Sequence, residues 1–433
     1  MLRRSAVTRS EAEPPVPTPP ETPGPHHPAP AKRRRRSVLL LAVVLGVLAA
    51  AGPLATDLYL PAFPMIAEDL GTTEARVQLT LTSSLLGLAV GQLAVGPMSD
   101  AWGRRGPLLA GTALFCVTSL LCMLVTSVEA FVAIRFVQGL AGSAGAVVSH
   151  AVVRDLYEGD EAARFFSRLM LVSGMAPILG PLLGGQLLLV GPWPLAFALL
   201  AAVNGLGFLA VLLLLPETLP RGDRRPLRPG ALLATVAHLL RDLRFLGPML
   251  ALSLNFGMMF TYISSFSFVS QNELGASPQT FGLLFALNAV GMMAGTQLNG
   301  LLIGRIDTTR RLLAGLLLGF GSVAAMVVLE LTDTAALPAL TAALAVMMFG
   351  MGVVFPNATT LALSSQPPSV AGTASALSGS SRFVFGGILA ALTGIAAGGH
   401  ASLASMVWVM AATAVLALGV FTATAWLGRS PAT

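Results

Sequence analysis

Three charged residues lie inside long apolar stretches, where they could carry protons or bind charged groups. They are Asp57, Arg135 and Arg382, whereas most other charges fall in tails, in loops or at the ends of such stretches. If the stretches cross a membrane, a charge near the bilayer centre costs roughly 3 kcal/mol, so these side chains should face a cavity or a partner. Asp57 shares a helical face with Ala50 and Pro53, which predicts a narrow face that ends in a carboxylate.

Asp57 and Arg135 are expected at similar depth. The first apolar stretch runs outward from about Val38, and Arg135 lies about 9 Å past the start of its own stretch near Glu129. Burial disfavours the charged form of Asp57, whereas a nearby guanidinium favours it. We therefore hypothesise that Asp57 is a proton-coupling or substrate-competing carboxylate that Arg135 tunes. The alternatives are a static ion pair, or an Asp57 that only caps its helix at the membrane interface.

Several further polar residues within the stretches are candidates for lining a cavity, because polar groups in spans tend to face the bundle interior. They are Gln138, Asn255, Asn288, Asn357 and Arg382. For each amide the alternative is a hydrogen bond between helices, and Arg382 could instead pair with a helix end or support a gate. One stretch also carries a run of large apolar side chains that suits either an adaptable pocket wall or a lipid-facing surface: Met258, Met259, Phe260, Tyr262, Phe266 and Phe268.

The composition excludes an ordinary soluble protein. Hydrophobic residues make up 55% of the 433 residues and charged residues 11%, and the mean hydropathy is +0.78. A soluble domain carries about 25% charged residues. A helical membrane span needs about 20 apolar residues, so about twelve spans with short loops would use nearly the whole chain. The expected fold class is therefore an all-α membrane protein.

Apolar stretches occur six before and six after one polar interval. Their approximate positions are 38–57, 74–98, 107–127, 130–153, 165–190, 193–215, 246–270, 280–303, 312–331, 335–363, 371–397 and 402–427. A plan of two six-helix bundles related by pseudo-symmetry is common among transporters. The predicted organisation is a disordered cytoplasmic tail (1–36), an N-terminal bundle (37–216), a cytoplasmic linker (217–244), a C-terminal bundle (245–428) and a short cytoplasmic tail (429–433).

The positions of the basic residues indicate one orientation. The net charge is +6, but the loops expected inside hold most of the arginines, whereas the loops expected outside hold Arg76 alone. This pattern follows the positive-inside rule for membrane topology and does not resemble a nucleic-acid-binding surface. It predicts that both chain ends are cytoplasmic.

The loop after the second stretch resembles the signature loop of the major facilitator superfamily. The residues that carry the likeness are Gly96, Asp100, Gly103, Arg104 and Arg105. The resemblance implies the major facilitator fold and a loop that latches the cytoplasmic side in one state and releases it in the other. Asp100 could accept hydrogen bonds from Arg104 or from a helix N-terminus. The alternative is that the arginines only set topology.

Two more motifs are similar to those of drug:proton antiporters in the same superfamily. One is the segment Arg135–Gly142 in the fourth span. The other lies in the fifth span and departs from the family pattern at Ala176, where a glycine is usual; its residues are Pro177, Gly180, Pro181, Gly184 and Gly185. Small residues at these positions also have a purely structural use, because they let helices approach closely in lipid.

The segments Thr56–Pro64, Arg154–Tyr157 and Ala371–Ser375 are similar to the Bcr/CflA branch of drug exporters. The resemblance implies a monomeric transporter of the bacterial inner membrane that exports drug-like molecules in exchange for protons. The alternatives are a proton-coupled uptake symporter and a dedicated exporter of an endogenous metabolite. A membrane-embedded enzyme or receptor would need a polar catalytic cluster, and none stands out. No ATP-binding loop or zinc motif occurs, so no cofactor or metal is expected.

Overall fold

The structure is a computed structural model that describes residues 35–224, 226, 229–367, 369–396 and 398–427. Its contacts group residues 1–39 apart from residues 40–433, and of the first group the described part is the opening of α1. The predicted tails therefore lie almost wholly outside the described residues. The exception is the pair Arg35 and Arg36, which belong to α1 instead of the tail; this difference is within the usual variation of helix ends.

The described part of the first half contains nine helical elements. These are α1 (Arg35–Asp57), η1 (Leu60–Ala62), α2 (Phe63–Asp69), α3 (Glu74–Trp102), α4 (Arg105–Cys122), α5 (Val128–Leu156), α6 (Gly159–Gly174), α7 (Ala176–Val190) and α8 (Pro194–Leu214). The described part of the second half begins with η2 (Arg221–Asp223) and α9 (Pro229–Leu239) and continues with α10 (Leu243–Phe268), η3 (Val269–Glu273), α11 (Pro278–Leu302), α12 (Thr308–Leu331), α13 (Leu337–Ser364), α14 (Ala371–Ala396) and α15 (Leu403–Leu427).

Within the described residues, twelve helical segments are long and apolar enough to cross a membrane. The segment Leu40–Asp69 joins α1 to α2, and Gly159–Val190 joins α6 to α7. All twelve coincide with the predicted apolar stretches, mostly to within a few residues. Polar side chains at the starts explain several boundaries, because Thr73, Ser127 and Ser277 each accept a hydrogen bond from a backbone N–H in the first turn of α3, α5 and α11.

Two elements differ from the sequence-based expectation. The fifth span is not one continuous helix, because α6 ends at Gly174 and α7 starts at Ala176, directly before Pro177. Proline tolerates the first turn of a helix but not its interior, so a break falls naturally at this point. The polar linker also contains a helix, α9, whose first residue is Pro229.

Glycines let α3 and α5 pack at very short range. A Cβ atom on Gly87 would lie 2.1 Å from the carbonyl oxygen of Phe136, and one on Gly139 would lie 2.0 Å from that of Ser84. No side chain fits at either position, so the two backbones are in direct contact. Close approach of this kind is the main source of helix association in lipid, where burial of apolar surface gives little driving force.

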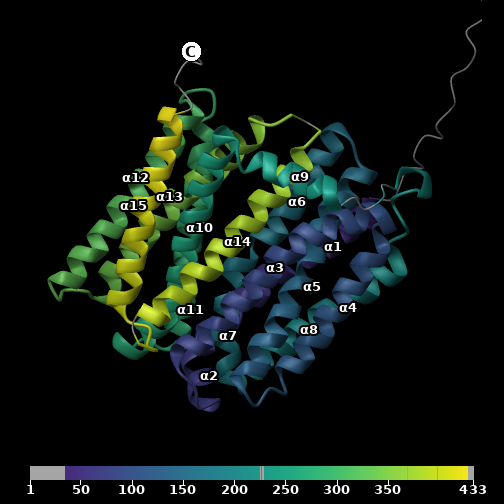
Figure 1. The fold of residues 1–433 in the computed structure, drawn as a ribbon. Coiled ribbons are helices and arrows are strands. Elements are labelled where there is room, and N and C mark those ends of the chain that lie inside the picture. The colour runs from purple at the N-terminus through teal and green to yellow at the C-terminus, as the bar shows by residue number, and fades with distance from the viewer. Residues whose placement is uncertain (1–34, 225, 227–228, 368, 397, 428–433) are drawn as a thin grey trace, which may run out of the picture. The chain divides into compact units, whose positions relative to one another are not determined.

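The two halves of the chain meet along paired helices. Helix α3 runs beside α14, and α7 packs against α11 (Figure 1). Helix α10 contacts α3, α13, α14 and α15, and 89% of its apolar window is buried, against 33% for α8. The two ends of the bundle are called the Glu74 end and the Trp102 end, after the first and last residues of α3.

Candidate functional site

Asp57 is a buried carboxylate at the end of α1. Only 4% of the residue is exposed, and its Oδ1 accepts a hydrogen bond of 2.9 Å from the Thr56 hydroxyl. On the α7 side, a Cβ atom on Gly180 would lie 3.0 Å from the Asp57 Cβ. Among the described residues, no cation lies within ion-pair distance of this carboxylate. The span continues beyond Asp57 to Asp69, so Asp57 is not an exposed cap at the end of a span.

Arg135 of α5 lies beside the last turn of α1, at the depth that the sequence predicted. Its guanidinium donates a 3.0 Å hydrogen bond to the Ala55 carbonyl and another to the Gln138 side-chain oxygen. The guanidinium carbon also lies 4.5 Å from the centre of the Tyr59 ring. Arg135 is therefore held by a backbone carbonyl, an amide and an aromatic face, and the static ion pair with Asp57 is not formed in this state.

Three of the candidate cavity amides instead link helices. The Gln138 amide donates to the Ser119 hydroxyl of α4 at 2.7 Å. The Asn288 amide donates to the Tyr262 hydroxyl at 2.9 Å, and the Asn357 amide donates to the Asn299 side-chain oxygen at 2.6 Å. Each bond joins two helices, as the alternative for these residues predicted.

Two of these candidates, Asn288 and Asn255, have side-chain polar groups that bond to no described residue. The Asn288 side-chain oxygen is buried without a hydrogen-bond partner in the described part of the chain. Asn255 is 3% exposed, and no hydrogen bond joins its side chain to another described residue. The two amides therefore retain capacity for a bound molecule or water.

Arg382 of α14 lies among aromatic rings. Its guanidinium carbon is 4.7 Å from the ring centre of Phe355, 5.4 Å from that of Phe256 and 5.8 Å from that of Phe383. Its Nε atom is buried without a partner, and no hydrogen bond or ion pair joins this guanidinium to any residue that the structure describes. The structure thus brings Arg382 together with apolar walls and not with Asp57 or Arg135.

The large apolar side chains of α10 face the protein. Each is at most 8% exposed, which excludes the lipid-facing alternative for Met258, Met259, Phe260, Tyr262, Phe266 and Phe268. Tyr262 stacks on Phe285 of α11, with ring centres 5.6 Å apart. These residues therefore form part of the packed interior between helices.

A charged cluster at the Trp102 end contains most of the signature-loop residues. The Arg104 guanidinium donates to Asp100 at 2.5 Å, to Ser99 at 2.8 Å and to Asp155 at 2.9 Å. Burial alone would lower the pKa of Arg104, but hydrogen bonds and charge from Asp155 and Asp100 outweigh it and raise this pKa. The bond from Arg104 to Asp100 is the one that the sequence predicted. The space beside Gly96 is open, because a Cβ atom at this position would have only Val147 as a neighbour within 4 Å, at 3.9 Å.

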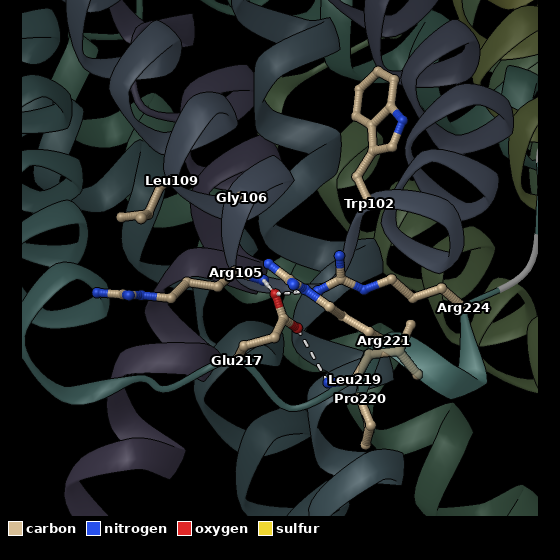
Figure 2. A pocket seen from close by; sticks show the side chains of 9 residues that line it. All are labelled: Trp102, Arg105, Gly106, Leu109, Glu217, Leu219, Pro220, Arg221 and Arg224. Atoms are coloured by element: carbon tan, nitrogen blue, oxygen red, sulfur yellow. Dashed lines mark hydrogen bonds and ion pairs between the residues drawn. The ribbon is translucent and has the colours of Figure 1, made fainter.

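Glu217, from the end of the first half, caps the start of α4 (Figure 2). Its carboxylate accepts hydrogen bonds from the backbone N–H of Arg104 at 2.7 Å and of Arg105 at 3.4 Å. Gly103 makes room for it, because a Cβ atom there would lie 2.3 Å from a Glu217 oxygen, and Gly103 also has a φ of +97°. Burial alone would raise the pKa of Glu217, but backbone N–H groups and the charge of Arg224 lower it below its ordinary value.

A surface pocket of about 620 Å³ adjoins this carboxylate. Trp102, Arg105, Leu109, Arg221 and Arg224 contribute to its wall (Figure 2). The Arg105 guanidinium turns away from Glu217 and donates to the Leu212 carbonyl at 2.7 Å. Arg105 thus fastens the start of α4 to the end of α8.

Sequence reasoning missed the roles of Asp155 and Glu217. In the sequence, Asp155 belongs to a segment of family likeness, and Glu217 is the first residue of the predicted linker. The signal available for both was an acidic residue at the end of an apolar stretch next to an arginine-rich loop. A charge in that place is usually a solvated one, and nothing in the sequence joins Glu217 to a loop 113 residues earlier.

The glycine and proline motif of the fifth span lies where α7 packs against the end of α1 in its own half and against α11 of the second half. A Cβ atom on Gly184 would lie 2.0 Å from the Leu58 carbonyl oxygen, and one on Gly185 would lie 2.9 Å from the Pro278 carbonyl oxygen. From the other side, a Cβ atom on Gly282 of α11 would lie 2.6 Å from the Pro181 carbonyl oxygen. The motif, which also includes Pro177 at the start of α7, therefore packs α7 against both the end of α1 and α11.

The Glu74 end is closed by hydrogen bonds between the halves. Glu74 accepts from the Asn272 amide at 2.7 Å and from the Ala401 backbone N–H at 2.6 Å. Ser267 of α10 donates to the Leu60 carbonyl at 2.6 Å. At the Trp102 end, the described ion pairs involve residues of α3, α5 and the segment after α8, and none reaches α10–α15. The structure therefore represents a state that is closed at the Glu74 end.

These features define a polytopic helical membrane protein with a buried carboxylate near the closed end. Residues 45–391 match the model of the Major Facilitator Superfamily, and the chain belongs to that family. It is 39% identical over 359 residues to the "Uncharacterized MFS-type transporter YdgK" of Bacillus subtilis, which covers 82% of this chain and 89% of the relative. It is 33% identical to the "Bicyclomycin resistance protein homolog" of Haemophilus influenzae, with 83% and 90% covered.

Solved structures show the same fold. A bacterial homologue of the human lysosomal transporter Spinster, in an inward-facing and occupied conformation, aligns with a TM-score of 0.70 at 18% identity, covering 93% of this chain and all of that one. The predicted major facilitator fold and the likeness to drug-transporter relatives are thereby confirmed. The chain is a multi-pass membrane transporter and not an enzyme. In the described part of the chain, no three His, Cys, Asp or Glu side chains gather as a metal site would require.

Proposed function

We propose that this transporter exports small drug-like molecules in exchange for protons. The single observation that carries the proposal is the environment of Asp57. It is a buried carboxylate with one hydroxyl partner, next to but not paired with a buried guanidinium. Burial favours its protonated form and the charge of Arg135 favours its ionised form, so a small change in surroundings can shift the balance.

The exchange follows from two states of the same bundle. Residues 37–216 and 245–428 act as two bundles that rock about a site between them, which is the alternating-access mechanism. In the state described above, the contacts of Glu74, Ser267 and Gln279 hold the Glu74 end closed. In the other state these contacts separate, and Asp57 gains access to protons from that side. Cargo and protons then compete for binding to the same conformations of the transporter.

The orientation and setting support export. Arginines concentrate in the loops at the Trp102 end, so the positive-inside rule assigns that end to the cytoplasm of a bacterial inner membrane. The relative from Haemophilus influenzae is named for bicyclomycin resistance, which is consistent with removal of a toxic compound. A single chain contains both halves and acts as a monomer, with a small molecule, protons and lipid as its partners.

The substitution Asp57→Asn tests the coupling role. We expect it to abolish proton release that accompanies export, measured with a pH-sensitive dye inside proteoliposomes that contain purified protein. Asp333→Asn is a matched control, because it removes an exposed carboxylate at the same end of the bundle. Full proton-coupled transport by Asp57→Asn would show that the proposal is wrong.

A protonophore separates export from uptake. For an exporter, collapse of the proton gradient should raise the amount of substrate inside expressing cells of a pump-deficient host. For an uptake symporter on the same scaffold, the amount should fall. The measurement uses chloramphenicol and bicyclomycin as probes, with cells that carry the empty vector as the reference.

A further inference from the structure

Arg382 lies near the middle of the membrane span formed by α14. It is about 16 Å along the helix from Ala371 in a span of about 39 Å. The helix is held on both sides there, because Ser381 and the α10 residue Ser253 share a hydrogen bond of 2.9 Å, and Ser380 donates to the Ala89 carbonyl at 2.9 Å. The guanidinium therefore has a fixed base at the place where α3, α10 and α14 converge.

Among the described residues, the buried arginines all have hydrogen-bond acceptors. Arg104 binds two carboxylates, and Arg135 binds an amide and a carbonyl. Arg311 donates to the Asn299 side-chain oxygen at 2.9 Å and to the Ile306 carbonyl at 3.1 Å. Arg382 alone, within the described ranges, has a half-buried guanidinium with no acceptor at all.

Phenyl rings cannot replace an acceptor. Phe256, Phe355 and Phe383 attract the positive charge through their ring faces, but they accept no ordinary hydrogen bond. A guanidinium has five N–H groups in a planar fork, and leaving them unpaired in a span is costly. A site with a cationic fork and apolar walls is complementary to a flat apolar molecule that carries an acceptor oxygen.

We propose that Arg382 and its three phenyl rings form a substrate subsite. It binds an aromatic or apolar cargo through a carboxylate or another strong acceptor oxygen, with the rings packed on the cargo's apolar part. The inference rests on the proposed export function and adds the chemical class of the cargo. The subsite lies in the second half, whereas Asp57 lies in the first, so an anionic group at Arg382 leaves Asp57 free to carry the proton.

Binding of three aromatic probes tests the subsite. Nalidixic acid carries a carboxylate, chloramphenicol is neutral with amide and nitro oxygens, and ethidium is a cation without an acceptor oxygen. Dissociation constants are measured with the purified full-length chain in lipid nanodiscs for wild type, R382Q, R382K and R310Q. Arg310 is exposed, so R310Q removes the same charge elsewhere in the second half.

We expect R382Q to weaken binding of nalidixic acid by about tenfold or more, because a hydrogen bond to a charged group is lost. Chloramphenicol should weaken less, and ethidium should bind equally or more tightly. R382K should fall between wild type and R382Q for nalidixic acid, since it keeps the charge without the planar fork. R310Q should leave all three constants unchanged. A melting temperature of each variant in the same nanodiscs identifies misfolding, and R382K still tests the subsite if R382Q unfolds.

Two results would contradict the inference in different ways. If R382Q and R382K leave the relative affinities of the three probes unchanged while wild type still exports them against a proton gradient, the subsite is wrong and export stands. If wild-type protein in proteoliposomes moves none of the probes in response to a proton gradient, the proposed export fails, and the subsite fails with it.

Discussion

At the residue scale, the buried charges of the protein differ in how fully they are paired. Arg104 is fully paired in a cluster of acceptors, whereas Asp57 has one hydroxyl partner. A paired charge stabilises one arrangement, because separation leaves an uncompensated ion. A weakly partnered carboxylate can gain or lose a proton at lower cost. The contrast fits a latch at the Trp102 end and a coupling group towards the Glu74 end.

Glu217 should stabilise the protein at neutral pH, and this stabilisation should be lost at acid pH. Its native pKa is lowered, so its contribution is present above the ordinary value near 4.5 and is lost as pH falls through the lower native value. Glu217→Gln should reduce stability by about 1 kcal/mol at pH 7, as expected for a helix cap. Thermal unfolding of purified protein at a series of pH values measures the difference from wild type, which should shrink towards acid pH.

Glu68→Gln is the control for this measurement, because Glu68 is exposed and makes no such cap. Its melting temperature should follow wild type at every pH. A deficit of Glu217→Gln that grows as the pH falls would contradict the assigned role.

Residue types in the site could be predicted, but their partners could not. Asp57 and Arg135 stood out because a charge in an apolar stretch is rare. The Ala55 carbonyl and the Tyr59 ring were not predictable as partners of Arg135, because they depend on how α1 and α5 rotate against each other. Glu217 escaped notice for a related reason, since the groups that donate to its carboxylate are backbone N–H groups and carry no signal in the sequence.

At the element scale, glycine positions determine how closely helices approach. Gly184 of α7 has no room for a side chain beside the Leu58 carbonyl, directly after Asp57. The packing of this motif thus sets the position of Asp57, the proposed coupling carboxylate. The approximate positions of the spans were predictable from apolar length, whereas the break at Met175 was not, since both sides of it are apolar.

The pair Gly184→Ala and Gly174→Ala tests this packing. A methyl group at Gly184 would lie 2.0 Å from a carbonyl oxygen, whereas Gly174 has no neighbouring atom within 4 Å. We expect Gly184→Ala to cost about 1–3 kcal/mol, as overpacking does, and to reduce transport strongly. Gly174→Ala should be neutral. Melting temperature and initial transport rate in proteoliposomes give both readouts, and equal behaviour of the two variants would refute the packing role.

At the scale of the whole molecule, the proposed alternating access requires the Glu74 end to open. Glu74 and Asn272 come from different halves and share a hydrogen bond of 2.7 Å, so the closed state holds them together. The sequence predicted two halves from six apolar stretches on each side of one polar interval, and the positions of the arginines predicted the orientation. It could not predict which end is closed, because both states use the same helices and differ only in contacts between the halves.

Cross-linking tests the opening directly. In a chain with Cys116 and Cys122 replaced by serine, cysteines are placed at Glu74 and Asn272 and joined by a short bis-methanethiosulfonate linker, which forms a reducible disulfide with each of them. We expect linked protein to lose at least about nine-tenths of its transport rate, because a covalent tie holds the halves in one state. A reducing agent should restore transport.

The control pair is Arg76 and Glu129, whose side chains are exposed and form a 2.8 Å ion pair within the first half. Cysteines linked there should leave transport intact, since no contact between halves is tied. Equal loss in both pairs, or no loss in the first, would argue against opening at the Glu74 end.

The enclosure of α10 has a consequence for how the chain is made. Helices α10 and α14 have the lowest hydropathy of the twelve described spans, and 89% of the apolar window of α10 is buried inside the protein. Among the buried serines of α10, Ser265 and Ser267 have partners in the first half, whereas Ser253 shares a hydrogen bond with Ser381 of α14. During synthesis α10 must enter the bilayer before α14 and α15 exist. The faces of α10 that α14 and α15 cover in the folded protein are therefore uncovered until those two helices have been made.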